Sequence, residues 1–162
     1  MARKTFPIYP QNMTPVNVDS FPIFRRVFRI SEEYAAKPLN ILSHNNSISA
    51  LEYELRILRL AYQAGVHVPR PDRIYQVTLP LHNEGENINT LALVMEYIEG
   101  LRLIEMLESR HPQYDTASAA FDAEKQNALD LGFEPNDCHH HNAIWNRERG
   151  LYLIDLREWR KK

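Results

Sequence analysis

The stretch that decides the fold reads Asp137-Cys138-His139-His140-His141-Asn142 and is followed by Leu153-Ile154-Asp155. Asp137 and Asn142 are five residues apart on a polar loop, and Asp155 comes thirteen residues later, directly after an apolar run. A carboxylate and an amide on one loop can converge with a second carboxylate across a hairpin. Oxygen ligands of this type suit Mg²⁺ bound to phosphates, which uses only one or two protein carboxylates. The remaining carboxylate could orient or deprotonate an attacking hydroxyl.

The sequence on either side of this loop predicts two helices and a hairpin. In chain order, the patterns indicate a short helix over 103–107, a longer helix over about 117–131, and strands over 143–145 and 151–154. Gly132 is expected to end the longer helix, and Gly150 to lie in the hairpin turn. The predicted hairpin therefore carries acidic residues at both ends.

The first hundred residues have the pattern of a small sheet with one inserted helix. Strand patterns cover 23–30, 34–37, 73–78 and 91–95, and polar residues predict turns at 31–33 and 82–87. The capping-box pattern Ser49-Ala50-Leu51-Glu52 predicts where the helix begins, and Gly65 predicts where it ends. Residues 1–19 contain three prolines and are expected to form an extended arm. The predicted fold class is α+β.

One acidic residue of the predicted helix needs a cationic partner. The apolar side chains recur at intervals of four, three and four residues, as Leu51, Leu55, Leu58 and Tyr62. Glu54 falls beside this stripe, whereas Glu52 lies on the polar face of the helix. A carboxylate beside a buried stripe must be paired. Arg25 and Arg29 could supply a purely structural partner for Glu54.

The composition limits the class of protein. The chain has 162 residues, of which 19 are Lys or Arg and 21 are Asp or Glu, giving a formal net charge of −2. This charge provides no strong positive field for a nucleic acid. The apolar runs are far shorter than the roughly 20 residues of a membrane span. A single cysteine excludes an internal disulfide framework and fits a reducing compartment. We therefore expect a cytoplasmic protein with no nucleic-acid or membrane partner.

The run His139-His140-His141 beside Cys138 suggests a zinc site, but the spacing of the residues does not favour one. Consecutive loop residues point in different directions, and no second Cys/His pair stands at ligand spacing. We expect His139 to brace the loop and His140 and His141 to be exposed. Cys138 is expected to be a small buried side chain rather than a nucleophile.

The spacing Asp-x-x-x-x-Asn followed by Asp at a strand end resembles the catalytic loop and the metal-binding Asp of the protein-kinase-like fold. Tyr34-Ala35-Ala36-Lys37 resembles the strand that carries the phosphate-binding lysine, and Glu54 resembles the helix partner of that lysine. Residues 93–100, Leu-Val-Met-Glu-Tyr-Ile-Glu-Gly, resemble the fifth strand and the hinge. The resemblance implies that the backbone at Glu96 and Ile98 would hold an adenine.

Two further details resemble the aminoglycoside phosphotransferase-like group, which includes choline and fructosamine kinases. His139 stands at the third position of Asp-x-His-x-x-Asn, and residues 65–71 read Gly-Val-His-Val-Pro-Arg-Pro. The resemblance covers roughly 21–159. It implies a small antiparallel-sheet N-lobe with one helix, and a reduced helical C-lobe with a β-hairpin. The implied division is an arm over 1–20, an N-lobe and hinge over 21–100, and a C-lobe over 101–162.

The resemblance also implies a function, a phosphotransferase that uses ATP and Mg²⁺ on a small-molecule acceptor. Lys37 would hold the nucleotide phosphates, with Glu54 orienting its ammonium. Asn142 and Asp155 would bind the metal, and Asp137 would position the acceptor hydroxyl.

The chain also departs from the pattern of active kinases. No glycine precedes Gly65, so the glycine-rich loop is missing, and Pro135 stands where a histidine is usual. The metal-binding motif reads Asp155-Leu156-Arg157 instead of Asp-Phe-Gly. The chain stops seven residues after Asp155, and the resemblance implies that most of the acceptor site would normally follow.

Two alternatives to an active kinase therefore stay open. One is a pseudokinase-like module that binds a nucleotide or a protein partner. The other is a fold recruited for different chemistry on a small metabolite. Missing distal helices would leave apolar surface to cover, so we expect either a homo-oligomer or shielding by the arm.

Overall fold

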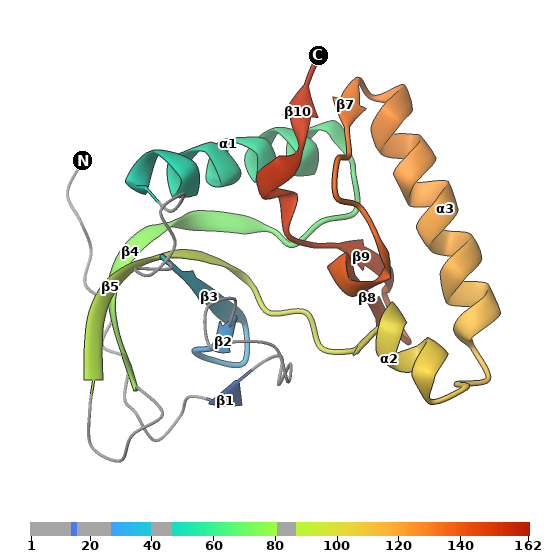
Figure 1. Cartoon of the computed structure of the whole chain (residues 1–162), viewed down its shortest axis with the longest axis horizontal. Helices are drawn as coiled ribbons and strands as arrows, with labels where there is room; N and C mark the ends of the chain where they lie inside the picture. The colour runs from blue at the N-terminus through green and yellow to red at the C-terminus, as the bar shows by residue number, and fades with distance from the viewer. Residues whose placement is uncertain (1–13, 16–26, 40–46, 81–86) are drawn as a thin grey trace. The chain divides into compact units, whose positions relative to one another are not determined.

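The structure, a computed structural model, describes residues 14–15, 27–39, 47–80 and 87–162 (Figure 1). The chain divides into two units, the first made of 1–55 and 71–97 and the second of 56–70 and 98–162. The boundary between the units therefore crosses one helix and, later in the chain, falls within the predicted hinge. Among the described residues, no helix has both the length and the apolar character needed to cross a membrane.

The first unit contains a five-stranded antiparallel sheet in the order β1-β2-β3-β5-β4. Its strands are β1 Thr14–Pro15, β2 Phe28–Arg29, β3 Tyr34–Pro38, β4 Pro71–Pro80 and β5 Asn87–Glu96. The predicted strands at 34–37, 73–78 and 91–95 are all present; β4 and β5 extend beyond both predicted ends, and β3 extends by one residue at its C-terminal end. Of the strand expected over 23–30, only β2 is seen, and 23–26 lie outside the described residues, as do 82–86 of the predicted turn. Two residues of the expected arm form the edge strand β1.

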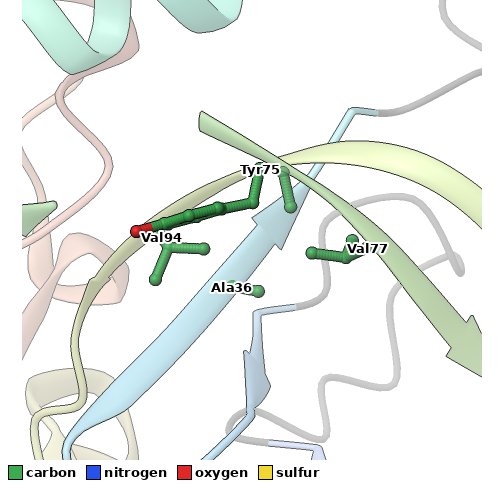
Figure 2. Packing of buried hydrophobic residues seen from close by; sticks show 5 residues of the cluster. Ala36, Tyr75, Val77 and Val94 are labelled. Atoms are coloured by element: carbon green, nitrogen blue, oxygen red, sulfur yellow. The ribbon is translucent and has the colours of Figure 1, made fainter. Parts of the chain in front are cut away.

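One face of this sheet is a closely packed apolar cluster. Figure 2 shows Ala36, Tyr75, Val77 and Val94 gathered together from β3, β4 and β5, and all four are buried. The hydroxyl of Tyr75 donates a hydrogen bond of 2.8 Å to Asp72, and burial followed by this bond raises the pKa of Tyr75. Because side chains alternate along a strand, the burial of Ala36 on this face places its neighbour Lys37 on the opposite one.

Helix α1, Ile48–Ala64, begins two residues earlier than predicted. The hydroxyl of Ser47, not Ser49, accepts the N–H of Ala50 at 3.2 Å, and Ser49 lies inside the first turn. The predicted capping box at Ser49 is therefore wrong, because Ser47, two residues earlier, satisfies a free N–H of the first turn. The helix ends where predicted, with Gly65 at φ +92°. The N–H of Val66 then bonds to the Ala61 carbonyl at 3.0 Å, as in a Schellman motif.

The second unit contains two helices and two small antiparallel sheets. Helix α2 covers Leu103–Glu108 and α3 covers Tyr114–Asp130. One sheet is formed by β6 Leu101–Arg102, β8 Ala143–Asn146 and β9 Gly150–Leu153. The other sheet is formed by β7 Phe133–Glu134 and β10 Arg160–Lys161. The 3₁₀ turns η3 and η4 cover His140–Asn142 and Leu156–Glu158. The predicted short helix and hairpin are present, and α3 begins three residues before its predicted start.

Glycine is required at the entry to the second unit. A Cβ on Gly100 would lie 2.3 Å from the Trp145 carbonyl oxygen, which no side chain can tolerate. The backbone of the segment after the predicted hinge thus passes directly against β8, where Leu101 pairs with Trp145.

Candidate functional site

The first unit holds a buried ion pair between the predicted phosphate-binding lysine and the predicted helix acid. Lys37 Nζ lies 2.7 Å from Glu54 Oε1, and the two side chains are 14% and 5% exposed. Glu52 is exposed, as the helical spacing predicted. Of the alternative partners, Arg29 donates to the Ser31 carbonyl and lies over the Tyr97 ring, and Arg25 is outside the described residues.

The hairpin of the second unit brings Asn142 and Asp155 to one end. Ala143 pairs with Leu153, so Asn142 lies opposite Ile154, and the Ile154 N–H donates to the Asn142 carbonyl at 2.9 Å. Asp155 is the next residue along the chain. Asn142 and Asp155, the two residues predicted to bind metal, are therefore close to each other along the paired backbones.

The third predicted group is tied to the same hairpin end. The Asn142 Nδ2 donates to the Asp137 carbonyl at 2.8 Å, which holds the loop closed across five residues. This bond turns Nδ2 toward Asp137, and Oδ1, which carries the lone pairs of the amide, is the atom of Asn142 that could bind a cation. The Asp137 side chain itself is 48% exposed. Hydrogen bonds therefore connect Asn142 to the backbone of Asp137 and to the backbone of Ile154, the residue before Asp155.

Both aspartates of this set have left-handed backbones. Asp137 has φ 54° and Asp155 has φ 59°, and the third such non-glycine residue in the described chain is Arg110. This conformation costs roughly 1–2 kcal/mol for most residues, and Asp is among those that tolerate it best. Among the described residues, the Asp155 side chain makes no capping hydrogen bond to η4, the turn that follows it. Strain of this kind gathers at functional sites.

The histidine run has three different surroundings. His139 Nε2 lies 3.2 Å from Asp137 Oδ1, and the exposed His141 meets the His139 ring edge-on. His140 is half-buried, contrary to our expectation, because η3 turns its ring toward α3. There it contacts the Tyr114 hydroxyl at 3.2 Å and the edge of the Phe121 ring. In the described part of the chain, no three or more His, Cys, Asp or Glu residues are grouped to hold a metal ion.

Cys138 lies between Asp137 and this run, and it is half-buried. Burial raises the pKa of its thiol to about 11, with Lys125 opposing the shift and Asp137 adding to it. The thiol is therefore neutral at physiological pH, and a neutral thiol is a poor nucleophile.

The predicted hinge residues lie on either side of the boundary between the units. Glu96 ends β5 opposite Tyr34 in the first unit, and the Tyr97 N–H donates to the Glu33 carbonyl at 2.8 Å. Ile98 begins the second segment of the second unit and is buried with Ile144 and Tyr152.

Sequence reasoning missed two residues that support this region, His67 and Glu124. The His67 ring stacks on Tyr152 of β9, and Glu124 of α3 accepts the His67 backbone N–H at 2.8 Å. The only available signal for His67 was its place in the 65–71 segment, which indicated a branch of kinases but no role. The C-terminal segment is also well packed, since Trp159 is buried against Phe133.

Comparison with known proteins shows the fold. No family model matches the sequence, and no curated protein is found to be related to it. The chain is similar to the solved structure of WbdD with the kinase inhibitor LY294002, with 19% identity, coverage of 88% of this chain and 32% of that one, and a TM-score of 0.56. It is also similar to another solved structure of WbdD, described as a bifunctional kinase-methyltransferase, with 20% identity and a TM-score of 0.54. The match covers 85% of this chain and 30% of that one.

The chain thus spans about a third of the length of these solved structures. At such identities the similarity shows the fold alone, and the fold is kinase-like. The predicted α+β class with small antiparallel sheets is confirmed at this level.

Proposed function

Because the chain has a kinase-like fold, we propose that it binds ATP with Mg²⁺ and transfers the γ-phosphoryl group to a hydroxyl of a small molecule. The observation that carries this proposal is the hairpin end, where the Ile154–Asn142 bond sets Asn142 beside Asp155 and the Asn142 amide binds the Asp137 carbonyl. The inhibitor-bound WbdD structure adds support, since that protein has a kinase activity and accepts a kinase inhibitor.

The donor set at the hairpin end fits Mg²⁺ on a nucleotide. Asn142 Oδ1 and the Asp155 carboxylate would be the protein ligands, with phosphate oxygens and water completing the shell. An ion held in this way needs no larger cluster of acids, and the described residues contain none. When bound, Mg²⁺ would neutralise the charge that develops on the phosphates during transfer.

The nucleotide contacts would come from the first unit and the predicted hinge. The Glu54 carboxylate fixes the Lys37 ammonium by the 2.7 Å bond, so the cation is held ready to bind the α- and β-phosphates. The backbone at Glu96 and Ile98 would hold the adenine.

Asp137 would orient the acceptor. One of its oxygens faces His139 at 3.2 Å, and the side chain is open to solvent. Its second oxygen can accept the hydrogen of an acceptor hydroxyl. As that hydroxyl oxygen bonds to the γ-phosphorus, the bond from phosphorus to the ADP oxygen breaks. The hydroxyl proton passes to Asp137, and ADP leaves.

One observation favours a non-catalytic alternative, in which the chain binds a nucleotide or a protein partner without turnover. The first 64 residues contain no glycine, so no glycine-rich loop can cover the phosphates. This alternative shares the binding chemistry of the main proposal and differs from it in the transfer step.

The binding step is tested by thermal unfolding with ATP and Mg²⁺, each alone and both together. At a hundred times the dissociation constant, binding adds about 2.7 kcal/mol, a rise of about 5–10 °C in Tm for a chain of this size. We expect Asp155→Asn to lose the Mg²⁺-dependent part of this rise, because Asn tolerates the left-handed backbone but lacks the charge. The exposed Asp122→Asn is the matched control and should behave as the wild type.

The transfer step is tested by ADP formation with small amino-alcohol and polyhydroxyl acceptors. Asp137→Asn should retain the Mg²⁺-dependent rise in Tm and lose turnover by about 10²–10⁴-fold. A wild-type chain with no rise in Tm under any condition would overturn the whole proposal. A wild-type chain that binds without turnover would establish the non-catalytic alternative.

A further inference from the structure

Strand β9, which leads into Asp155, is held along its length by one residue of another segment. The His67 Nδ1 donates to the Leu151 carbonyl, and the His67 ring packs against the Tyr152 ring with 4.0 Å between ring centroids and an interplanar angle of 32°. The Leu153 N–H donates to the His67 carbonyl at 2.9 Å. His67 therefore contacts three successive residues of β9, and all of these groups belong to the second unit.

His67 is itself fixed from its other side by α3. The Glu124 carboxylate accepts the His67 backbone N–H at 2.8 Å and the Asn127 side-chain amide at 2.9 Å. Both backbone polar groups of His67 are thus engaged, one toward α3 and one toward β9. His67 therefore connects α3, through Glu124, to β9, the strand before Asp155, and we call this set of contacts the His67 bracket.

The last contact of this bracket is next to the candidate metal ligands. Leu153, bound to His67, precedes Ile154, whose N–H donates to the Asn142 carbonyl at 2.9 Å. A displacement of β9 would therefore change the register between Asn142 and Asp155. Groups that hydrogen-bond to a metal ligand typically change metal affinity by 10–100-fold when they are removed, and His67 would act one step further away, through β9.

We propose that His67 is a positioning residue that sets the place of the Asp155 carboxylate relative to Asn142. This inference rests on the proposed function, in which those two side chains bind Mg²⁺. Nδ1 is the donor in this bond, because the Leu151 carbonyl can only accept a hydrogen bond. The ring then contributes in two separable ways, as a donor and as a flat partner for Tyr152.

Three variants separate these contributions from general stability. His67→Phe keeps an aromatic ring for Tyr152 and removes the donor, whereas His67→Asn keeps an N–H near the Nδ1 position and removes the ring. The matched control is His111→Phe, because His111 is also half-buried in the second unit and its ring nitrogen bonds to the Gln113 N–H rather than to β9.

The first readout is hydrogen exchange, which requires no ligand. In His67→Phe we expect the Leu153 and Ile154 amides to exchange at least tenfold faster, with β5 of the first unit unchanged. His67→Asn should restore most of this protection. Unchanged exchange at Ile154 in His67→Phe would overturn the inference, whether or not the protein binds ATP.

The second readout is the Mg²⁺ concentration that gives half of the ATP-dependent rise in Tm. His67→Phe should raise it about tenfold, and His67→Asn and His111→Phe should stay close to the wild type. A lower Tm in His67→Phe with an unchanged Mg²⁺ requirement would show a purely structural role and overturn the inference. Failure of the proposed function has a different signature, since the wild type itself would then show no Mg²⁺-dependent rise.

Discussion

Lys37 and Glu54 form an ion pair whose two side chains are largely shielded from solvent. Replacing Lys37 by Met would leave the Glu54 carboxylate, 5% exposed, without this 2.7 Å partner. Removing one member of a buried pair typically lowers the free energy of unfolding by about 3–5 kcal/mol, and we expect a loss of that order. Urea unfolding followed by circular dichroism measures it.

The double variant Lys37→Met/Glu54→Leu is the diagnostic partner of this experiment. It removes both charges together, so we expect it to recover most of the stability that the single variant loses. Glu52→Gln, an exposed change on the same helix, is the control and should stay within about 0.5 kcal/mol of the wild type. A single variant as stable as the control would mean that the pair contributes nothing to the fold.

Periodicity was enough to predict that Glu54 needs a partner, because the spacing of Leu51, Leu55 and Leu58 fixes which helical positions are buried. The identity of the partner came from the resemblance, since no local pattern connects residues 37 and 54. The left-handed backbones of Asp137 and Asp155 could not be predicted, because Asp occupies ordinary conformations far more often.

The start of α1 gives a prediction at the scale of a single element. Ser47→Ala removes the oxygen that accepts the Ala50 N–H, and we expect it to cost about 1 kcal/mol. Ser49→Ala is the matched control, because Ser49 lies within the helix, where Ala is the better helix former. Urea unfolding should therefore show a loss for the first variant and no loss for the second. The reverse result would place the cap at Ser49.

Element ends were harder to predict than element types for a physical reason. Ser47 and Ser49 are both good capping residues, and the choice depends on where the preceding chain enters the helix. At α3 the apolar signal begins with the buried Ala117, but the helix starts at Tyr114, whose N–H bonds to the His111 carbonyl. The exposed polar residues in that first turn carry no apolar periodicity. His140 was misjudged in the same way, since only the fold of η3 turns its ring inward.

At the scale of the whole molecule, the two units are interleaved along the chain. Residues 48–55 of α1 belong to the first unit and residues 56–64 to the second. The order of the longer strands and helices was predictable from local patterns, but the two-residue strands β1, β6, β7 and β10 were not predicted. The division into units depends on contacts between residues far apart in sequence. Half of a helix of this length is marginal in isolation, so neither unit is expected to keep its part of α1 without the other.

This shared helix predicts that the two units unfold together. Both tryptophans of the chain, Trp145 and Trp159, lie in the second unit, so tryptophan fluorescence reports on that unit alone. We expect the urea transition seen by fluorescence to coincide with the transition seen by far-ultraviolet circular dichroism, which reports on both units.

Lys37→Met tests the coupling between the units directly, because the substitution alters the first unit whereas both tryptophans lie in the second. If α1 couples the units, the variant should lower the fluorescence midpoint by as much as the circular dichroism midpoint. A fluorescence midpoint equal to that of the wild type, together with an earlier loss of circular dichroism, would show that the first unit unfolds alone. In that case α1 would break near Leu55, and the loss of stability in Lys37→Met would belong to the first unit only.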